Sequence, residues 1–245
     1  MKMTTKIPIK GDVMNDMQGA FYDYYGMPAT HPQAIDDALK EANGDDVVLD
    51  IASNGGDVSS ASTIYTSLRD YSGKVTAHIQ GMAASAASII AMSADTIEMS
   101  PTAIMMIHKC SVNGGITGNS DDLRQVAQAM DETDKAIAES YMAKTGLSMG
   151  DLLNMMTDET WMSARTAADK GFADSVMFDD GENATMSNAL ESDAISSEGL
   201  NKFNTMLMQI KDLKNTAPEP TTPESELEDK HHKELLKAKL AIING

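Results

Sequence analysis

The stretch KVTAHIQGMAASAASIIAMS, residues 74–93, decides the fold of this chain. It predicts an apolar strand over 75–79 that runs into Gly81, followed by a helix of small residues with Ser85 near its start. A serine at such a strand-to-helix turn presents its hydroxyl beside the free N–H groups of the first helical turn, where an anionic intermediate can be held. This geometry suits a nucleophile, although a closely packed Ala/Ser-rich core helix without any chemistry has the same pattern.

Strand and helix patterns alternate on both sides of this stretch. The elements predicted before it are a strand over 5–14 closed by Gly11 and Asp12, a helix from Pro32 to Asn43-Gly44, a strand in DDVVLDIAS (45–53) buried on both faces of a parallel sheet, and a helix from Val58 to about Gly73. Those predicted after it are a strand in AIMMIHK (103–109), a polar stretch with a β-capable piece over 111–122, a helix from about Asp121 to Lys144 capped by Ser120 or Asp121, a helix in 147–156, and a turn, a short helix capped by Ser163 and a last strand in 158–176. Repeated strand–helix units indicate right-handed βαβ crossovers in a layered α/β domain.

The long helix predicted over 121–144 is amphipathic. Its apolar stripe consists of Leu123, Val126, Ala127, Met130, Ile137 and Tyr141, with Asp131, Glu132 and Lys135 on the opposite side. The pattern therefore predicts one apolar face along this helix.

Composition excludes several classes of protein. The chain has 245 residues and a formal net charge of −18, which argues against binding to nucleic acid or to an anionic membrane. No run of eighteen apolar residues occurs, so neither a membrane span nor a signal peptide is indicated. The single cysteine cannot form an internal disulfide and fits a reducing compartment, so we expect a cytoplasmic protein. The composition changes near residue 178, and 179–245 predicts an acidic, polar linker with a possible C-terminal amphipathic helix.

Three further elements have the chemistry to act with Ser85. His108 stands at a strand end, where a histidine can serve a serine as general base, although a lone histidine in an apolar strand is often a core residue. Asp158 and Glu159 offer a carboxylate that could orient the imidazole, or they form only a solvated turn. The backbone N–H groups of Gly56 and Ala86 could stabilise an oxyanion.

The four motifs NGGDV, GMAASAAS, MMIH and ETWMSA, taken in this order, resemble the proteolytic subunit of the Clp (caseinolytic) proteases over about residues 5–178. The resemblance points in particular to the Clp-like proteases of phage and prophage head-assembly modules. It implies Ser85 as nucleophile, His108 as base, and Gly56 with Ala86 as oxyanion donors. The family's usual aspartate falls on Glu159, which leaves open whether Glu159, Asp158 or neither is the third member.

The resemblance also implies an architecture and partners. The fold is a spiral of βαβ units, similar to that of the crotonases, with residues 111–144 in the place of the helix-and-strand handle. The resemblance implies a ring-shaped homo-oligomer that acts on protein or peptide substrates without a cofactor or metal. Capsid or scaffold proteins are the substrates expected in phage head maturation, in the host cytoplasm or the prohead. No P-loop occurs, so any ATP use would come from a partner ATPase.

Alternative hypotheses remain at this stage. A catalytically inactive Clp-fold assembly or scaffold protein would keep the fold and use 179–245 for scaffolding. A crotonase-type acyl-CoA enzyme shares the fold but leaves Ser85 and His108 unexplained as a pair. Cys110 lies two residues after His108, so a thiol nucleophile is conceivable beside the ordinary interpretation of a buried structural cysteine.

Overall fold

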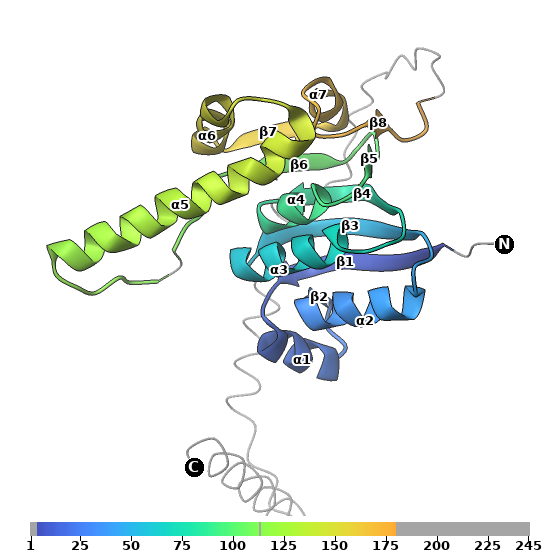
Figure 1. The fold of residues 1–245 in the computed structure, drawn as a ribbon, viewed down its shortest axis with the longest axis horizontal. Helices are drawn as coiled ribbons and strands as arrows, with labels where there is room; N and C mark the ends of the chain where they lie inside the picture. Colours follow the sequence, from blue (N-terminus) through green and yellow to red (C-terminus); the bar gives the residue numbers. More distant parts are fainter. Residues whose placement is uncertain (1–3, 113, 180–245) are drawn as a thin grey trace, which may run out of the picture. The chain divides into compact units, whose positions relative to one another are not determined.

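An eight-stranded, mainly parallel sheet organises the part of the chain that the computed structural model describes, residues 4–112 and 114–179 (Figure 1). The strands follow the order β2-β1-β3-β4-β5-β8, with β6 beside β4 and β7 beside β6, and β6–β7 is the antiparallel pair. The strands are β1 (Thr5–Val13), β2 (Ala29–Thr30), β3 (Val47–Gly56), β4 (Val75–Ala84), β5 (Thr96–Met99), β6 (Ile104–Ile107), β7 (Thr160–Ser163) and β8 (Ser175–Val176). The helices are α1 (Asp16–Tyr24), α2 (Pro32–Ala42), α3 (Val58–Arg69), α4 (Ala86–Ala91), α5 (Ser120–Thr145), α6 (Met149–Thr157) and α7 (Ala164–Asp169). The predicted α/β fold with a parallel sheet is confirmed, whereas the predicted linker and C-terminal helix of 179–245 lie, from residue 180 on, outside the described residues.

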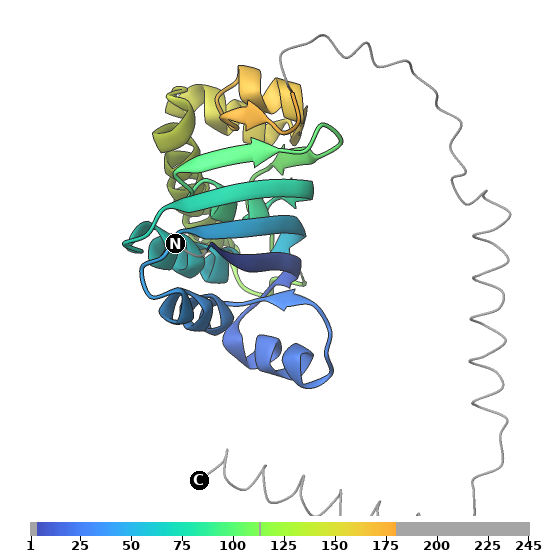
Figure 2. The same cartoon turned by 90° about the vertical axis from the view of Figure 1, so that its right-hand side faces the viewer.

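Helices α2, α3 and α4 cover one face of the sheet (Figure 2). Strand β3 shows the consequence, since its residues alternate between buried and partly exposed, with Leu49 and Ile51 in the core and Asp50 on the other face. The prediction that this strand is buried on both faces is therefore wrong. On the second face Asp50, His78 and Glu98 lie in register across β3, β4 and β5, and Nε2 of His78 lies 3.2 Å from Glu98. Asp50 also lies 3.5 Å from Nζ of Lys6 in β1.

Strand β4 is longer than the sequence predicts, and two different strands pair with successive parts of it. Its first half pairs with β5 and its second half with β6, so the strand continues through Gly81 to Ala84 instead of ending at Gly81. The following helix, α4, begins at Ala86 and has only six residues, all of them buried. Ser85 therefore lies in the turn itself, between the strand and the helix.

The first half of helix α5 projects away from the sheet and the other helices (Figure 1). Asn119 caps it in a capping box with Asp122, in place of the predicted Ser120 or Asp121, and Gly146 ends it in the left-handed conformation. The side chains of α5 that are buried within this chain all lie in its second half, and Leu123 is 45% exposed, so the described residues of this chain leave the first half of the apolar stripe uncovered. No strand forms in the described residues of the polar stretch that precedes it. None of the helices within residues 4–112 and 114–179 is both long enough and apolar enough to cross a membrane.

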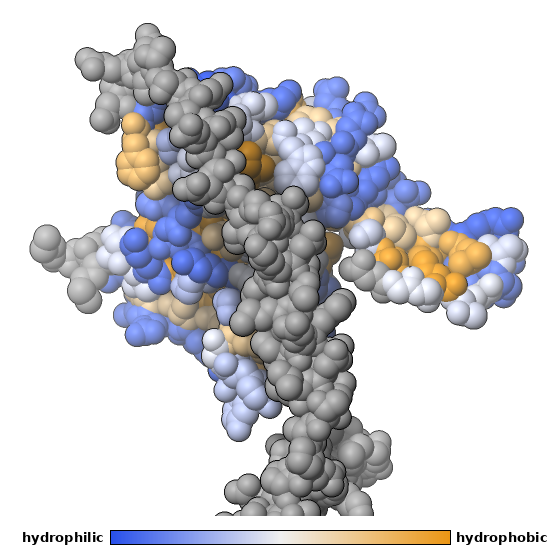
Figure 3. All heavy atoms as spheres, turned by 180° about the vertical axis from the view of Figure 1, so that it is seen from behind, coloured by the Kyte–Doolittle hydropathy of each residue, from blue (hydrophilic) through white to orange (hydrophobic). Residues whose placement is uncertain are grey.

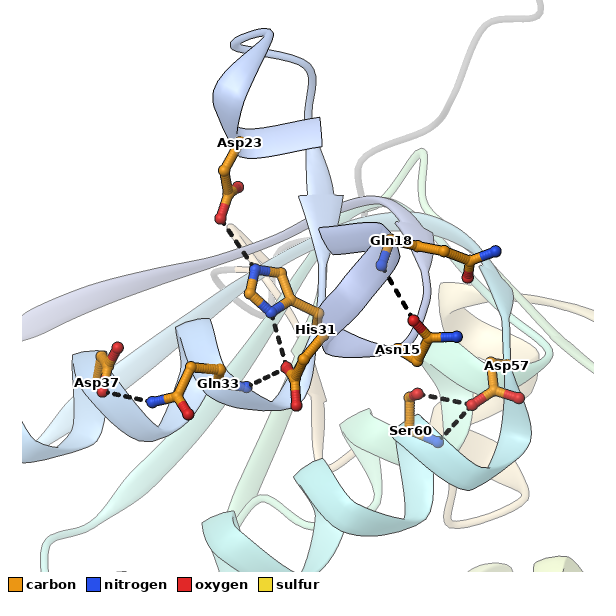
Figure 4. A network of polar contacts seen from close by, with 9 residues as sticks. Asn15, Gln18, Asp23, His31, Gln33, Asp37, Asp57 and Ser60 are labelled. Atoms are coloured by element: carbon orange, nitrogen blue, oxygen red, sulfur yellow. Dashed lines mark hydrogen bonds and ion pairs between the residues drawn. The ribbon is translucent and has the colours of Figure 1, made fainter. Parts of the chain in front are cut away.

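A buried histidine fastens α1 to the start of α2 (Figure 4). Nδ1 of His31 lies 2.9 Å from Asp16 and Nε2 lies 3.0 Å from Asp23, while the ring packs directly against Gly19. Burial of the ring lowers the pKa of His31, but the two carboxylates outweigh it and the net pKa is raised. Both ring nitrogens thus face acceptors, which favours the imidazolium form and holds α1 in place.

Candidate active site

Ser85 occupies the sharp turn between β4 and α4. Its backbone angles, φ 54° and ψ −125°, lie outside the regions that a serine ordinarily adopts, and strain of this kind is typical of functional turns fixed by their surroundings. Although Ser85 is the N-cap of α4, its side chain makes no capping hydrogen bond. The hydroxyl is therefore available to a partner other than the helix.

That partner is His108, the residue that follows β6. Its Nε2 atom lies 2.7 Å from Oγ of Ser85, within hydrogen-bonding distance. The parallel pairing of β4 with β6 brings them together, because Ala84 lies beside Met106 and the N–H of Ser85 donates to the Met106 carbonyl at 2.9 Å. An imidazole in this position can take the hydroxyl proton as the oxygen attacks a carbonyl carbon.

Glu159 reaches the neighbourhood of His108 through the antiparallel β6–β7 pair. The last pair of the register joins Ile107 to Thr160, and His108 and Glu159 are the residues immediately beyond this pair. Glu159 has a φ of 49° at the junction between α6 and β7, and both it and Asp158 are exposed. Within the described residues, His108 forms no hydrogen bond or ion pair with a carboxylate. Both residues therefore lie at the end of the same strand pair, but no bond joins their side chains.

Two glycines at the end of β3 flank the nucleophile turn. Gly55, at φ 94°, lies so close that a Cβ there would be 2.8 Å from Cβ of Ser85 and 2.8 Å from N of Ala86. Gly56 borders β1 on its other side, where a Cβ would overlap the carbonyl oxygen of Val13. Ala86 is the first residue of α4, so its N–H has no carbonyl partner within the helix. Gly55 and the N–H of Ala86 therefore border the nucleophile turn, and a free backbone N–H in this position can stabilise an oxyanion.

A cleft of about 760 Å³ opens beside these glycines. Its walls include both glycines, the end of β1, residues 110–112 and the α1 side chains of Gln18 and Tyr22. The volume lies in the range of ligand sites in proteins. A second cleft, of about 850 Å³ between α3 and α5, contains none of the predicted site residues. The first is not lined by Ser85 or His108, but it is lined by Gly56, and on that ground it is the candidate substrate site.

Cys110 lines the cleft but lacks the properties of a nucleophile. Burial, followed by the neighbouring Asp134 carboxylate, raises the pKa of its thiol to about 11, so the sulfur is protonated at neutral pH. The structural role for this cysteine is therefore favoured over the thiol mechanism. Among the described residues, no group of three or more His, Cys, Asp or Glu side chains is arranged to hold a metal ion.

Comparison with known proteins assigns the family. The sequence model of the family described as Clp protease matches residues 37–180, a segment that includes Ser85, His108 and Glu159. The chain belongs to the Clp protease family. It is 30% identical over 164 residues to the ATP-dependent Clp protease proteolytic subunit 1 of Chlamydia abortus, covering 63% of this chain and 85% of that protein. The subunit of the same name from Protochlamydia amoebophila is 30% identical over 136 residues, covering 55% of this chain and 66% of that protein.

The Clp fold is also found among solved structures. A ClpP1 mutant from Listeria monocytogenes superposes with a TM-score of 0.59 at 18% identity, covering 70% of this chain and 90% of that one. At 18% identity, this similarity shows only that the two chains share a fold. Membership of the Clp family supports a serine-type peptidase activity. Clp proteases act on protein substrates and assemble as oligomeric rings.

Proposed function

We propose that this Clp-family chain is a serine endopeptidase with Ser85 as nucleophile and His108 as general base. The observation that carries the proposal is the 2.7 Å contact between Oγ of Ser85 and Nε2 of His108 at a strained strand-to-helix turn. A serine hydroxyl is a weak nucleophile unless a base takes its proton, and this contact supplies the base.

The proposed reaction is acyl transfer in two steps. Oγ of Ser85 attacks the peptide carbonyl carbon while His108 takes its proton, and the imidazolium then protonates the leaving amine. The oxyanion of each tetrahedral intermediate accepts hydrogen bonds from the N–H groups of Ala86 and Gly56. Water, deprotonated by His108, next attacks the acyl ester, and the imidazolium returns this proton to Oγ of Ser85 as the second product leaves. Glu159 is the proposed third member, supported by the position of Glu159 and His108 immediately beyond the last pair of the β6–β7 register.

Peptide hydrolysis by matched serine variants tests this proposal. Ser85→Ala should abolish cleavage of an unfolded protein and of short fluorogenic peptides, leaving the circular dichroism spectrum unchanged. The control is Ser93→Ala, because Ser93 is also buried near α4 but donates only to the carbonyl of Ile90. Full cleavage by Ser85→Ala would remove this serine from the reaction.

We also propose that the protein works as a homo-oligomeric ring. The support from this structure is apolar surface on the projecting arm, made by the start of α5 and the loop before it (Figure 3). Val112, Ile116 and Leu123 are each exposed by at least 44%, an arrangement that suits contact with another copy. Size-exclusion chromatography with light scattering should give a multimer that Leu123→Asp weakens. A wild-type monomer at micromolar concentration would contradict the proposal.

The physiological substrate that we propose is a capsid or scaffold protein during phage or prophage head maturation. This part rests on the resemblance of the motifs to Clp-like proteases of head-assembly modules. The names of the relatives include the words ATP-dependent, so delivery of substrates by a separate ATPase is the competing arrangement. Incubation of the purified protein with capsid and scaffold proteins, without any ATPase, should produce discrete fragments. Cleavage only in the presence of an ATPase and ATP would favour the competing arrangement.

A catalytically inactive assembly protein is the second candidate. It is favoured by the lack, within the described residues, of a carboxylate bonded to His108. An assembled wild-type protein whose Ser85 does not react with serine-directed reagents would support it.

A further inference from the structure

The buried face of α5 contacts residues that follow both members of the proposed catalytic pair, Ser88 after Ser85 and Cys110 after His108. The buried side chains of this helix are those of Asp134, Ile137, Ala138 and Tyr141. They recur at i, i+3, i+4 and i+7, so they form one face over two helical turns. Asp134 and Tyr141 end in polar groups that the proposed hydrolysis steps do not use.

Tyr141 reaches the nucleophile turn through Ser88. Its hydroxyl oxygen lies 2.8 Å from Oγ of Ser88, and Oγ of Ser88 donates to the carbonyl oxygen of Ser85 at 2.6 Å. Because a serine hydroxyl has one proton and Ser88 gives it to Ser85, the phenol must be the donor in the first bond. Burial holds the pKa of Tyr141 well above its usual value, so the phenol keeps its proton.

The hydrogen bonds that run from Tyr141 through Ser88 to Ser85, called the Tyr141 relay below, act on the peptide group that supplies an oxyanion donor. The carbonyl of Ser85 and the N–H of Ala86 belong to one planar peptide group, so fixing the direction of the carbonyl also fixes that of the N–H. Within α4 the same carbonyl accepts the N–H groups of Ser88 at 2.9 Å and Ile89 at 3.4 Å, and the Ser88 hydroxyl adds a third donor. The bond from Tyr141 thus ties the orientation of the Ala86 N–H to α5.

Asp134 holds the other half of the catalytic pair. Its Oδ1 atom accepts the backbone N–H of Cys110, two residues beyond His108, at 2.7 Å. The side chain is almost fully buried, and a buried carboxylate is retained only where it is hydrogen-bonded. The Cys110 thiol also donates to the carbonyl of Met130, one turn earlier in α5, at 3.5 Å. The chain that leaves the histidine is therefore fastened to α5 at two points.

We propose that Tyr141 and Asp134 are positioning residues for the peptidase reaction. From one face of α5, Tyr141 holds the Ser85–Ala86 peptide through Ser88, and Asp134 holds the backbone that follows His108. The inference rests on the proposed function, because it concerns the geometry of the same serine and histidine.

Removal of single hydroxyl groups tests the Tyr141 relay. Tyr141→Phe keeps the ring contact with Phe172, whose centroid is 5.7 Å away, and removes only the hydroxyl. We expect kcat for a short peptide to fall about tenfold with KM unchanged, because a misdirected oxyanion donor affects the transition state and not the bound substrate. Affinity for a peptide boronate, which mimics the tetrahedral state, should fall by the same factor. Ser88→Ala should have the same effect, and the double variant should lose no more than either single variant.

The matched control is Tyr71→Phe. The Tyr71 hydroxyl accepts the N–H of Gly44 at 2.9 Å and donates to the carbonyl of Asp45 at 2.7 Å, just before β3 and therefore at the opposite end of that strand from Gly55. This variant should lower the melting temperature and leave kcat at the wild-type value. Wild-type kcat in Tyr141→Phe and Ser88→Ala, or an equal loss in the control, would overturn the relay.

Two substitutions test Asp134. Asp134→Asn keeps an oxygen that can accept the Cys110 N–H, whereas Asp134→Ala removes it. We expect Asp134→Ala to lower kcat about tenfold and Asp134→Asn to retain most of the wild-type value, because one hydrogen bond to a charged or amide oxygen decides the position of the chain. Equal kcat in both folded variants would overturn the role of Asp134.

Failure of the inference and failure of the proposed function give different results. Wild-type protein that neither cleaves peptides nor binds the boronate refutes the proposed function and the inference together. Active wild-type protein with unimpaired variants refutes the positioning roles alone.

Discussion

Replacement of Gly55 by alanine measures how closely the glycine turn and the nucleophile turn must pack. At a φ of +94°, alanine costs roughly 1–2 kcal/mol in backbone strain. The added methyl group would also lie 2.5 Å from the carbonyl oxygen of Ala84 and 2.8 Å from the nitrogen of Ala86. Because ordinary contacts begin at 3.4 Å, one backbone must yield by about 0.9 Å to relieve the 2.5 Å approach.

A displacement of that size at the nucleophile should lower kcat/KM about a hundredfold, since roughly 1 Å of misplacement has this effect on reacting groups. The free energy of unfolding should fall by about 3 kcal/mol, from backbone strain together with overpacking. Hydrolysis of a fluorogenic peptide and urea unfolding measure the two quantities. The matched control is Gly26→Ala, which has a φ of +64° and nothing within 4 Å of the added methyl group. It should lose about 1 kcal/mol of stability and no activity. Unchanged kcat/KM in Gly55→Ala, or an equal loss in the control, would refute the reasoning.

Three further predictions concern titratable groups. The raised pKa of folded His31, above its ordinary 6.5, stabilises the protein fully below that value and less as the pH rises through the folded pKa. The difference in melting temperature between wild type and His31→Gln should therefore be largest below pH 6.5 and shrink as the pH rises through the raised pKa of His31, and a difference that grows with pH would contradict the ion pairs. The thiol of Cys110, with a pKa of about 11, should react with iodoacetamide far more slowly at pH 7 than a free cysteine and speed up with rising pH, which mass spectrometry can follow because the chain has one cysteine. Glu159→Gln should lower kcat by roughly a hundredfold or more if Glu159 orients His108, whereas Asp158→Asn should leave it unchanged, and the reverse result would give the role to Asp158.

Local signals predicted those elements whose ends are chemically marked. Pro32 begins α2 and Asn43 ends it in the left-handed conformation, and Ser163 caps α7, all as predicted. The long helix ends at Gly146, as its Thr145-Gly146 stop indicates. In each case the residue type itself prefers the observed backbone geometry, so the sequence alone is sufficient.

Elements that depend on a distant partner were not predictable in the same way. Strand β7, expected as a turn, has only four residues and forms because it pairs with β6, more than fifty positions earlier in the chain. The four-residue β5 was missed for the same reason, since its neighbours β4 and β8 create its ladder. The extension of β4 to Ala84 likewise follows from pairing with β6.

The candidate site shows the same division. The order of the motifs indicated that Ser85 and His108 belong together, but only the β4–β6 pairing places them 2.7 Å apart. His31 carried no signal in the sequence, because its partners Asp16 and Asp23 are brought to it by the fold of α1. Tyr141 was expected as one more apolar residue of the long helix, and its bond to Ser88 depends on how α5 packs against α4.

Labelling with a fluorophosphonate tests the central claim most directly, because the reagent reacts with a serine only where a base activates the hydroxyl and amides hold the developing anion. Mass spectrometry of the labelled wild-type protein should find a single modified residue, Ser85. The modification should disappear in His108→Ala and persist in His78→Ala, a histidine on the charged face of the sheet. A protein that is folded and assembled but unlabelled, or labelled at another serine, would contradict the account.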